Sequence, residues 1–257
     1  YVGGKGDVVE FEAEISDLHT GAYAVGFTAT NLEPGDPNNL NNWNLLGNPY
    51  PSPINAASIV FPPELNASIY YWNDATLMYE VWAGGIGSQY IPATQAFFVK
   101  AIADGSLNVD NSMRTHNGAN SYYKSTIDDL LTIEVSVSDH KDVTYIRFED
   151  DASEQFDRLY DAYKLLSPAN VPQLYTMLNG TDYAINALSP SELVPMAFKA
   201  GIPGNYTIKA LETSQFNEVH LEDLFTGEVT NLLEENYTFG HTIDANKDRF
   251  LVHFGPL

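Results

Sequence analysis

Residues 131–139, LTIEVSVSD, and residues 143–148, VTYIRF, lie on either side of a short polar connection and decide the fold class. In the first stretch every second residue is apolar: Leu131, Ile133, Val135 and Val137. A period of two predicts a β-strand with one face turned toward a core. The polar residues 138–142, SDHKD, suit a turn. Together the two stretches predict an antiparallel β-hairpin.

The same alternation recurs along the chain and predicts further strands in VVEFEAEI (8–15), NYTIKAL (205–211), NEVHLEDL (217–224), NYTFGHT (236–242) and RFLVHF (249–254). Spacing typical of an amphipathic helix is rare. The best candidate is SEQFDRLYDAYKLL at 153–166, and it is long enough only for a turn or two. The sequence therefore predicts an all-β protein with antiparallel sheets.

A polar, turn-rich segment between Asp104 and Thr126 suggests a division of the chain. We expect two antiparallel, jelly-roll-like β-sandwich domains in tandem. The first is a Trp- and Pro-rich domain at 1–112, the segment 113–125 is a linker, and the second domain covers 126–257.

The charge balance excludes some partners. The chain has 34 acidic and 12 basic residues, a formal net charge of -22, and this charge repels nucleic acid. No stretch approaches the length of apolar sequence that inserts into a membrane. There is no cysteine, so disulfides and thiolate chemistry are excluded.

Catalytic signatures are missing from the sequence. There is no G-x-S-x-G, H-E-x-x-H or Walker motif, and GGIGSQ at 84–89 lacks the last glycine of a dinucleotide fingerprint. Acidic pairs occur, but with 34 acidic residues chance alone produces them, and none stands out as the acid and base of a glycosidase. We assign no catalytic residue and expect a protein that is not an enzyme.

Aromatic residues gather in SIYYWNDATLMYEVWAGG at 68–85. Sugar rings stack on such side chains, so a carbohydrate platform is predicted from Tyr71, Trp72, Tyr79 and Trp82. The alternative is that large aromatic residues at alternate strand positions fill a sandwich core.

Two acidic segments could bind calcium, because this ion prefers several carboxylate and amide oxygens on one loop. In EDDASEQFDRLYD (149–161) the candidate ligands are Glu149, Asp150, Asp157 and Asp161. In DANKDRF (244–250) Asp244, Asn246 and Asp248 have the spacing of a calcium loop, but Arg249 occupies the position of its glycine. The alternative is that both are solvated acidic loops, so calcium is a candidate and no cofactor is assigned.

WNLLGNPYPSP at 43–53 predicts a structural corner. Gly47 permits a sharp bend, and each proline keeps the residue before it out of the helical region. We expect Trp43 and Tyr50 to pack over this bend.

Several motifs also carry a family resemblance: WNLLGNPYPSPIN (43–55), IYYWN (69–73), IPATQAFFVKA (91–101), YIRFEDDASEQFDRLYDAYKL (145–165), VPMAFKAGIPGNYTI (194–208) and DRFLVHF (248–254). Over residues 20 to 257 the chain resembles modules of large secreted and surface proteins of the Bacteroidetes. In that family a WNLxGNPYPS-type region and a companion β-sandwich usually precede a C-terminal sorting domain for type IX secretion.

The resemblance implies an extracellular or outer cell-surface location and contact with the type IX secretion machinery during export. It supplies no catalytic residues. We therefore expect a non-catalytic module for adhesion, surface assembly or glycan attachment, with polysaccharides or other surface proteins as partners. The alternative is a glycan-binding accessory module of a secreted polysaccharide-degrading enzyme.

Overall fold

The computed structural model describes residues 18–30, 41–116, 127–168, 170–213, 215–243 and 245–255. The predicted strand at 8–15, the predicted linker from residue 117 onward and Asp244 lie outside these ranges. Within them the chain forms strands, turns and two short 3-10 segments, so the predicted all-β class is confirmed. None of the described elements is a helix capable of spanning a membrane.

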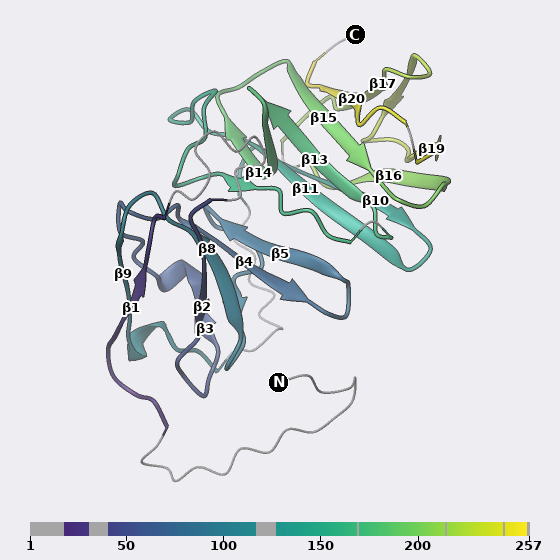
Figure 1. Cartoon of the computed structure of the whole chain (residues 1–257). Helices are drawn as coiled ribbons and strands as arrows, with labels where there is room; N and C mark the ends of the chain where they lie inside the picture. Colours follow the sequence, from purple (N-terminus) through teal and green to yellow (C-terminus); the bar gives the residue numbers. More distant parts are fainter. Residues whose placement is uncertain are drawn as a thin grey trace.

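The N-terminal group of strands forms three small antiparallel sheets (Figure 1). A five-stranded sheet has the order β2-β8-β4-β5-β6, and β1-β9 and β3-β7 form two-stranded sheets. The elements are β1 (Tyr23–Phe27), β2 (Trp43–Gly47), β3 (Ile54–Asn55), η2 (Ala56–Ser58), β4 (Ser68–Asn73), β5 (Met78–Ala83), β6 (Ile86–Gly87), β7 (Tyr90–Ile91), β8 (Ala96–Lys100), β9 (Gly105–Val109) and η3 (Asn111–Met113).

The C-terminal group forms one 11-stranded sheet in the described part of the chain, with the order β18-β17-β20-β15-β13-β14-β11-β10-β16-β19 and β12 paired to β14. The strands are β10 (Leu130–Val137), β11 (His140–Phe148), β12 (Ala162–Tyr163), β13 (Gln173–Leu178), β14 (Thr181–Leu188), β15 (Leu193–Lys199), β16 (Gly204–Glu212), β17 (His220–Asp223), β18 (Glu228–Asn231), β19 (Tyr237–His241) and β20 (Asp248–His253). The predicted hairpin is confirmed as β10–β11, in which Val137 pairs with His140 across a tight turn. The expectation of antiparallel sheets is wrong for one pair, because β11 and β14 run parallel.

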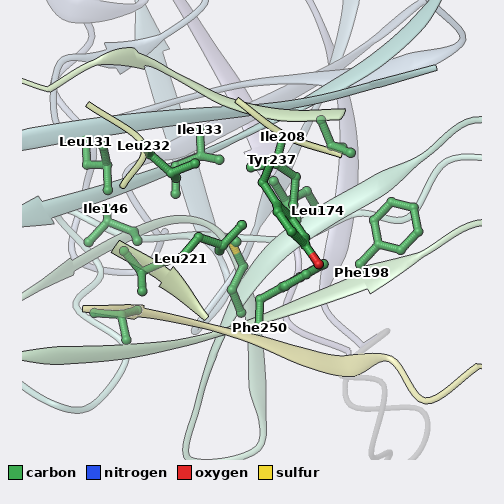
Figure 2. Close-up of a cluster of buried hydrophobic side chains, with 14 of the residues drawn as sticks. Leu131, Ile133, Ile146, Leu174, Phe198, Ile208, Leu221, Leu232, Tyr237 and Phe250 are labelled. Atoms are coloured by element: carbon green, nitrogen blue, oxygen red, sulfur yellow. The ribbon is translucent and has the colours of Figure 1, made fainter. Parts of the chain in front are cut away.

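This long sheet curls into a nearly closed, barrel-like shape around one hydrophobic cluster. Leu131, Ile133 and Val135 are fully buried in this cluster, as the alternation in their strand predicted. Figure 2 shows side chains of β10 and β16 facing Leu221 of β17 and Phe250 of β20 across the core. Because strands from both ends of the sheet contribute to one core, burial of apolar surface holds the sheet in its curled shape.

A buried ion pair at one end of the sheet also makes hydrogen bonds to the strand at the other end. Asp223 at the end of β17 accepts hydrogen bonds from Arg249 of β20, with Nε at 3.0 Å and Nη2 at 2.6 Å. Arg249 Nη1 donates to the carbonyl oxygen of Gly240 in β19 at 2.8 Å, and the hydroxyl of Tyr237, also in β19, donates to Asp223 at 2.7 Å. β19 lies at the far end of the strand order from β17, so these contacts close the curled sheet.

A third buried cluster joins the two groups of strands. Tyr70 and Val81 of the N-terminal sheet pack with Leu130, Ala162 and Ile185 of the C-terminal sheet. The Tyr70 hydroxyl also accepts a hydrogen bond from the backbone N–H of Tyr163 at 2.8 Å. The predicted division into domains at 112 stays a prediction.

The corner at 43–53 has the structural role expected of it. The buried Asn48 side chain donates to the carbonyl oxygens of Ser52 and Pro92, both at 2.9 Å, and accepts from the N–H of Tyr50 at 3.0 Å. Tyr50 is buried beside the bend, as predicted. Trp43 does not pack over it, because it lies at the other end of β2, against Tyr70 with ring centroids 5.0 Å apart.

The segment 153–166, the best candidate for a helical turn or two, forms no helix in the structure. The segment contains turns and the short strand β12, which pairs with β14. Phe156 stacks on Tyr163 with ring centroids 4.0 Å apart, and the Asp161 side chain reaches a backbone N–H of β14. These contacts, one within the segment and one with strand β14, outweigh the weak helical pattern.

Candidate functional site

The four aromatic residues of the predicted carbohydrate platform lie on the β4–β5 hairpin. Trp72 pairs with Tyr79, Tyr71 with Glu80, and Ile69 with Trp82. Directly paired residues share a face, and neighbouring residues on a strand point to opposite faces. The hairpin therefore carries Trp72 and Tyr79 on one face and Tyr71 and Trp82 on the other.

Tyr71 and Trp82 belong to the core of the N-terminal group. Trp82 is only 8% exposed and stacks on Phe61 with ring centroids 6.0 Å apart. Tyr71 packs against the same cluster, and its burial raises the pKa of its hydroxyl. Tyr71 and Trp82 therefore fill the core, which is the alternative role considered for these aromatic residues.

Trp72 and Tyr79 form a half-buried pair on the other face. Their ring centroids are 5.2 Å apart with the planes at 70°, and Tyr79 also contacts Phe98 edge to face, at 6.2 Å. Such edge-to-face contacts fix the orientation of both rings. The structure thus brings together two of the four predicted residues as a rigid aromatic surface.

A small cleft of about 100 Å³ lies beside Tyr79, between the β4–β5 hairpin and strand β11 of the C-terminal sheet. Its lining residues are Thr76, Met78, Tyr79, Glu80, Val81, Lys141, Asp142, Val143 and Tyr145. Burial, together with the charges of Glu80, Glu212 and Asp142, raises the pKa of Tyr145 well above its usual range, so its hydroxyl stays protonated at neutral pH. The cleft thus combines aromatic rings with neutral and charged polar groups.

Sequence reasoning missed the wall of the cleft that β11 supplies. Lys141 and Tyr145 belong to the β10–β11 hairpin, and nothing in that stretch distinguishes them from other polar or aromatic strand residues. They meet Tyr79 only because the two groups of strands pack together. No local pattern could have identified them.

Three of the four predicted calcium ligands at 149–161 have other partners in the structure. Glu149 pairs with Arg147 at 2.5 Å, and Asp150 is exposed. Asp157 accepts from the N–H of Ser153 at 2.6 Å. Asp161 accepts from the N–H groups of Asp157 at 2.8 Å and Ala187 at 2.7 Å.

Within the described residues, no three side chains of the types His, Cys, Asp and Glu are placed to hold a metal ion together. In the second acidic segment Asp248 pairs with Lys247 at 2.8 Å. Arg249, which stands at the glycine position of the calcium-loop pattern, points inward to Asp223. Asp157 and Asp161 therefore hold a turn and the neighbouring strand β14 in the described structure.

Asp161 is the carboxyl group of this region with the most perturbed titration. It is almost fully buried, and this burial raises its pKa from 3.8 to about 7, although its two backbone hydrogen bonds act in the opposite direction. A carboxyl group whose pKa is higher in the folded than in the unfolded state stabilises the fold at low pH. That contribution is lost as the pH rises through about 7.

An Asp161→Asn variant should therefore change how stability depends on pH. Between pH 4 and pH 8 the unfolding free energy of the unaltered protein should fall, relative to that of the variant, by on the order of 3 kcal/mol. Urea unfolding at several pH values measures this difference. Asp150→Asn, at an exposed site in the same segment, is the matched control and should leave the profile unchanged. Parallel profiles for Asp161→Asn and the unaltered protein would contradict the assignment.

Comparison with known protein families identifies the family of the chain. The model of the family described as Domain of unknown function (DUF8693) matches residues 79–254. The matched range begins in β5 and runs to the end of the C-terminal sheet, so it includes Tyr79 and the β11 wall of the cleft but not Thr76 or Met78. No curated protein and no solved structure matches the chain.

Proposed function

We propose that this chain, which belongs to the DUF8693 family, is a non-catalytic binding module that acts in adhesion, surface assembly or glycan attachment. The observation that carries the proposal is the half-buried pair of Trp72 and Tyr79 beside the cleft between the two groups of strands. The same pair would serve an accessory glycan-binding module of a polysaccharide-degrading enzyme.

A sugar is the ligand class that suits this surface best. The apolar face of a pyranose ring stacks on an aromatic side chain, and its hydroxyl groups need donors and acceptors at the edge of that contact. Trp72 and Tyr79 supply the aromatic surface. Thr76, Lys141 and Tyr145 supply hydroxyl and ammonium groups in the adjoining cleft. Because the cleft is small, it would hold one substituent of a sugar whose ring lies on the aromatic pair.

The setting of this function is part of the same proposal. We place the protein outside the cell or on the outer cell surface, with export by type IX secretion, because of its resemblance to Bacteroidetes surface modules. Its partners would be polysaccharides or other surface proteins. We also propose that the two groups of strands are two jelly-roll-like β-sandwich domains in tandem, at 1–112 and 126–257.

Glycan-array binding tests the proposal. We expect retention on at least one class of polysaccharide and, for Trp72→Ala or Tyr79→Ala, a loss of about five- to thirtyfold in affinity, because each stacking contact contributes about 1–2 kcal/mol. Phe225→Ala is the control, since Phe225 is 80% exposed and lies outside the cleft. Trp82 is unsuitable for this test because its removal would damage the core.

Circular dichroism should show that the Trp72→Ala and Tyr79→Ala proteins are folded. Equal retention of these two variants and the unaltered protein would rule out the aromatic pair as the binding surface. Failure of the unaltered protein to bind any glycan would count against the sugar as ligand.

A further inference from the structure

A larger cavity, of about 510 Å³, lies at one end of the curled C-terminal sheet. Its walls come from the end of β11, the β14–β15 turn, the β16–β17 connection and the residues after β20. The lining residues are Phe148, Pro190, Ser191, Glu192, Gln215, Phe216, Asn217, Glu218, Phe254 and Gly255. Its volume lies within the range of ligand-binding pockets, about 300–1,000 Å³, and mouths of barrel-like sheets are frequent ligand sites.

Three phenylalanines form the apolar part of the cavity. The ring centroids of Phe148 and Phe254 are 4.7 Å apart, those of Phe216 and Phe254 5.0 Å, and those of Phe148 and Phe216 5.5 Å. All three rings pack against the main hydrophobic cluster and are half-buried. They therefore cover the end of the core with one side and offer the cavity an apolar surface with the other.

Two glutamates supply the charge of the cavity. Glu192 is exposed on the β14–β15 side. Glu218, on the β16–β17 side, has its Oε2 atom buried without a hydrogen-bond partner among the described residues. A buried acceptor left in this state destabilises the fold, and more so when it is charged. The described lining includes no lysine or arginine that could compensate the carboxylate.

The three phenylalanine rings are accounted for on their inner sides, because there they cover the hydrophobic core. That structural role does not account for the unpaired carboxylate oxygen of Glu218. Glu218 lines the cavity, so a ligand with a cationic donor would pair with its carboxylate and would also be attracted by the net charge of -22. An apolar group of the same ligand, next to its cation, would cover the surfaces of the three phenylalanine rings that face the cavity. Arginine is well suited, because its guanidinium group stacks on aromatic rings and donates to carboxylates.

We propose that this cavity binds a segment of a partner polypeptide in which an aromatic or aliphatic residue adjoins an arginine or lysine. The apolar side chain rests on Phe148, Phe216 and Phe254, and the basic side chain donates to Glu218. The cavity is formed without Trp72 or Tyr79, so this proposal is tested independently of glycan binding.

NMR titration with acetyl-Phe-Arg-amide and its neutral isostere acetyl-Phe-citrulline-amide tests the proposal on the unaltered protein. We expect saturable shifts confined to the backbone amides that line the cavity, at 191–192, 215–218 and 254–255. The arginine peptide should bind about tenfold more tightly than the citrulline peptide, which has the same shape but lacks the charge. Equal affinities for the two peptides, or shifts spread over other surfaces, would overturn the proposal.

A pair of variants identifies the carboxylate. Glu218→Gln preserves the shape of the side chain and should reduce the preference for the arginine peptide to about twofold or less. Glu235→Gln removes an exposed charge in the β18–β19 connection and should preserve the preference. An unchanged preference in Glu218→Gln would show that the cation binds elsewhere and would overturn the role of Glu218.

Discussion

An Arg249→Leu variant should lose about 3–5 kcal/mol of unfolding free energy, which is a large fraction of the stability of a typical domain. Arg249 is 5% exposed, and its partner Asp223 is fully buried. Removing the guanidinium group leaves a buried carboxylate without its cation and removes the donor to Gly240 in β19. Equilibrium unfolding in urea, followed by tryptophan fluorescence and circular dichroism, measures the loss.

The expected loss is large because a buried carboxylate is tolerated only while its cation and hydrogen-bond donors are present. Burial acts to raise the pKa of Asp223, but the hydrogen bonds from Arg249, Tyr237 and the N–H of Phe225 hold it below its usual range. The guanidinium carbon also lies over the ring of Phe239, 4.4 Å from its centroid. Leucine replaces only the apolar part of these contacts.

Lys247→Leu is a suitable control for Arg249→Leu, because Lys247 pairs with Asp248 at a half-exposed site nearby. Exposed pairs contribute about 0–1 kcal/mol, so this variant should remain close to the unaltered protein. If Arg249→Leu lost no more stability than Lys247→Leu, the ion pair would not be what closes the sheet.

A Lys164→Met variant should also lose about 3–5 kcal/mol, and a second substitution should restore part of the loss. Lys164 and Asp142 form an ion pair in which the side chains are 6% and 3% exposed. Asp142 lies near the start of β11 and also accepts a hydrogen bond from the N–H of Leu174 in β13, at 2.6 Å. Methionine keeps the packing volume of the lysine stem but leaves the buried carboxylate without a cation.

The double variant Lys164→Met with Asp142→Asn isolates the charge effect. The asparagine has no charge to compensate, and its oxygen can still accept from Leu174, so the double variant should be more stable than Lys164→Met alone by at least about 1 kcal/mol. Lys141→Met is the control, because Lys141 is 59% exposed where it pairs with Glu134. A double variant less stable than the single variant would contradict this account of the pair.

The strands could be predicted from the sequence because their signal is local. Leu131, Ile133 and Val135 alternate with polar residues within one strand, and the turn after them is polar. Burial of those three side chains followed directly from the pattern. The structure of 153–166 could not be predicted in this way, because it depends on contacts with residues distant in sequence. Asp161 and Phe156 contact strand β14, and these contacts override the weak helical periodicity of the segment.

The site was only partly predictable. The aromatic content of 68–85 indicated where the candidate site lies. Because neighbouring residues on a strand point to opposite faces, Tyr71 and Trp72 must lie on different faces of the sheet. Which face belongs to the core depends on how the sheets pack, and that information is not in the segment. Arg249 shows the same limit, because in the sequence it only spoiled a calcium-loop pattern, whereas in the fold it is the partner of Asp223.

The cavity at the end of the C-terminal sheet could not have been found from the sequence. Phe148, Phe216 and Phe254 each end or follow an ordinary strand segment and lie far apart in the chain. Each of them alone is typical of a core residue. Only the curl of the sheet places the three rings together beside Glu218.

The contacts around Asp223 differ in kind from those that join the other strands of the C-terminal sheet. Elsewhere neighbouring strands are joined by main-chain ladders that almost any sequence can form. At this seam the described hydrogen bonds between β19 and the β17–β20 pair all involve the side chains of Tyr237, Asp223 or Arg249. Related chains could therefore loosen or tighten the barrel by exchanging a few side chains, without altering a single strand. The seam is where evolution could most readily adjust its rigidity.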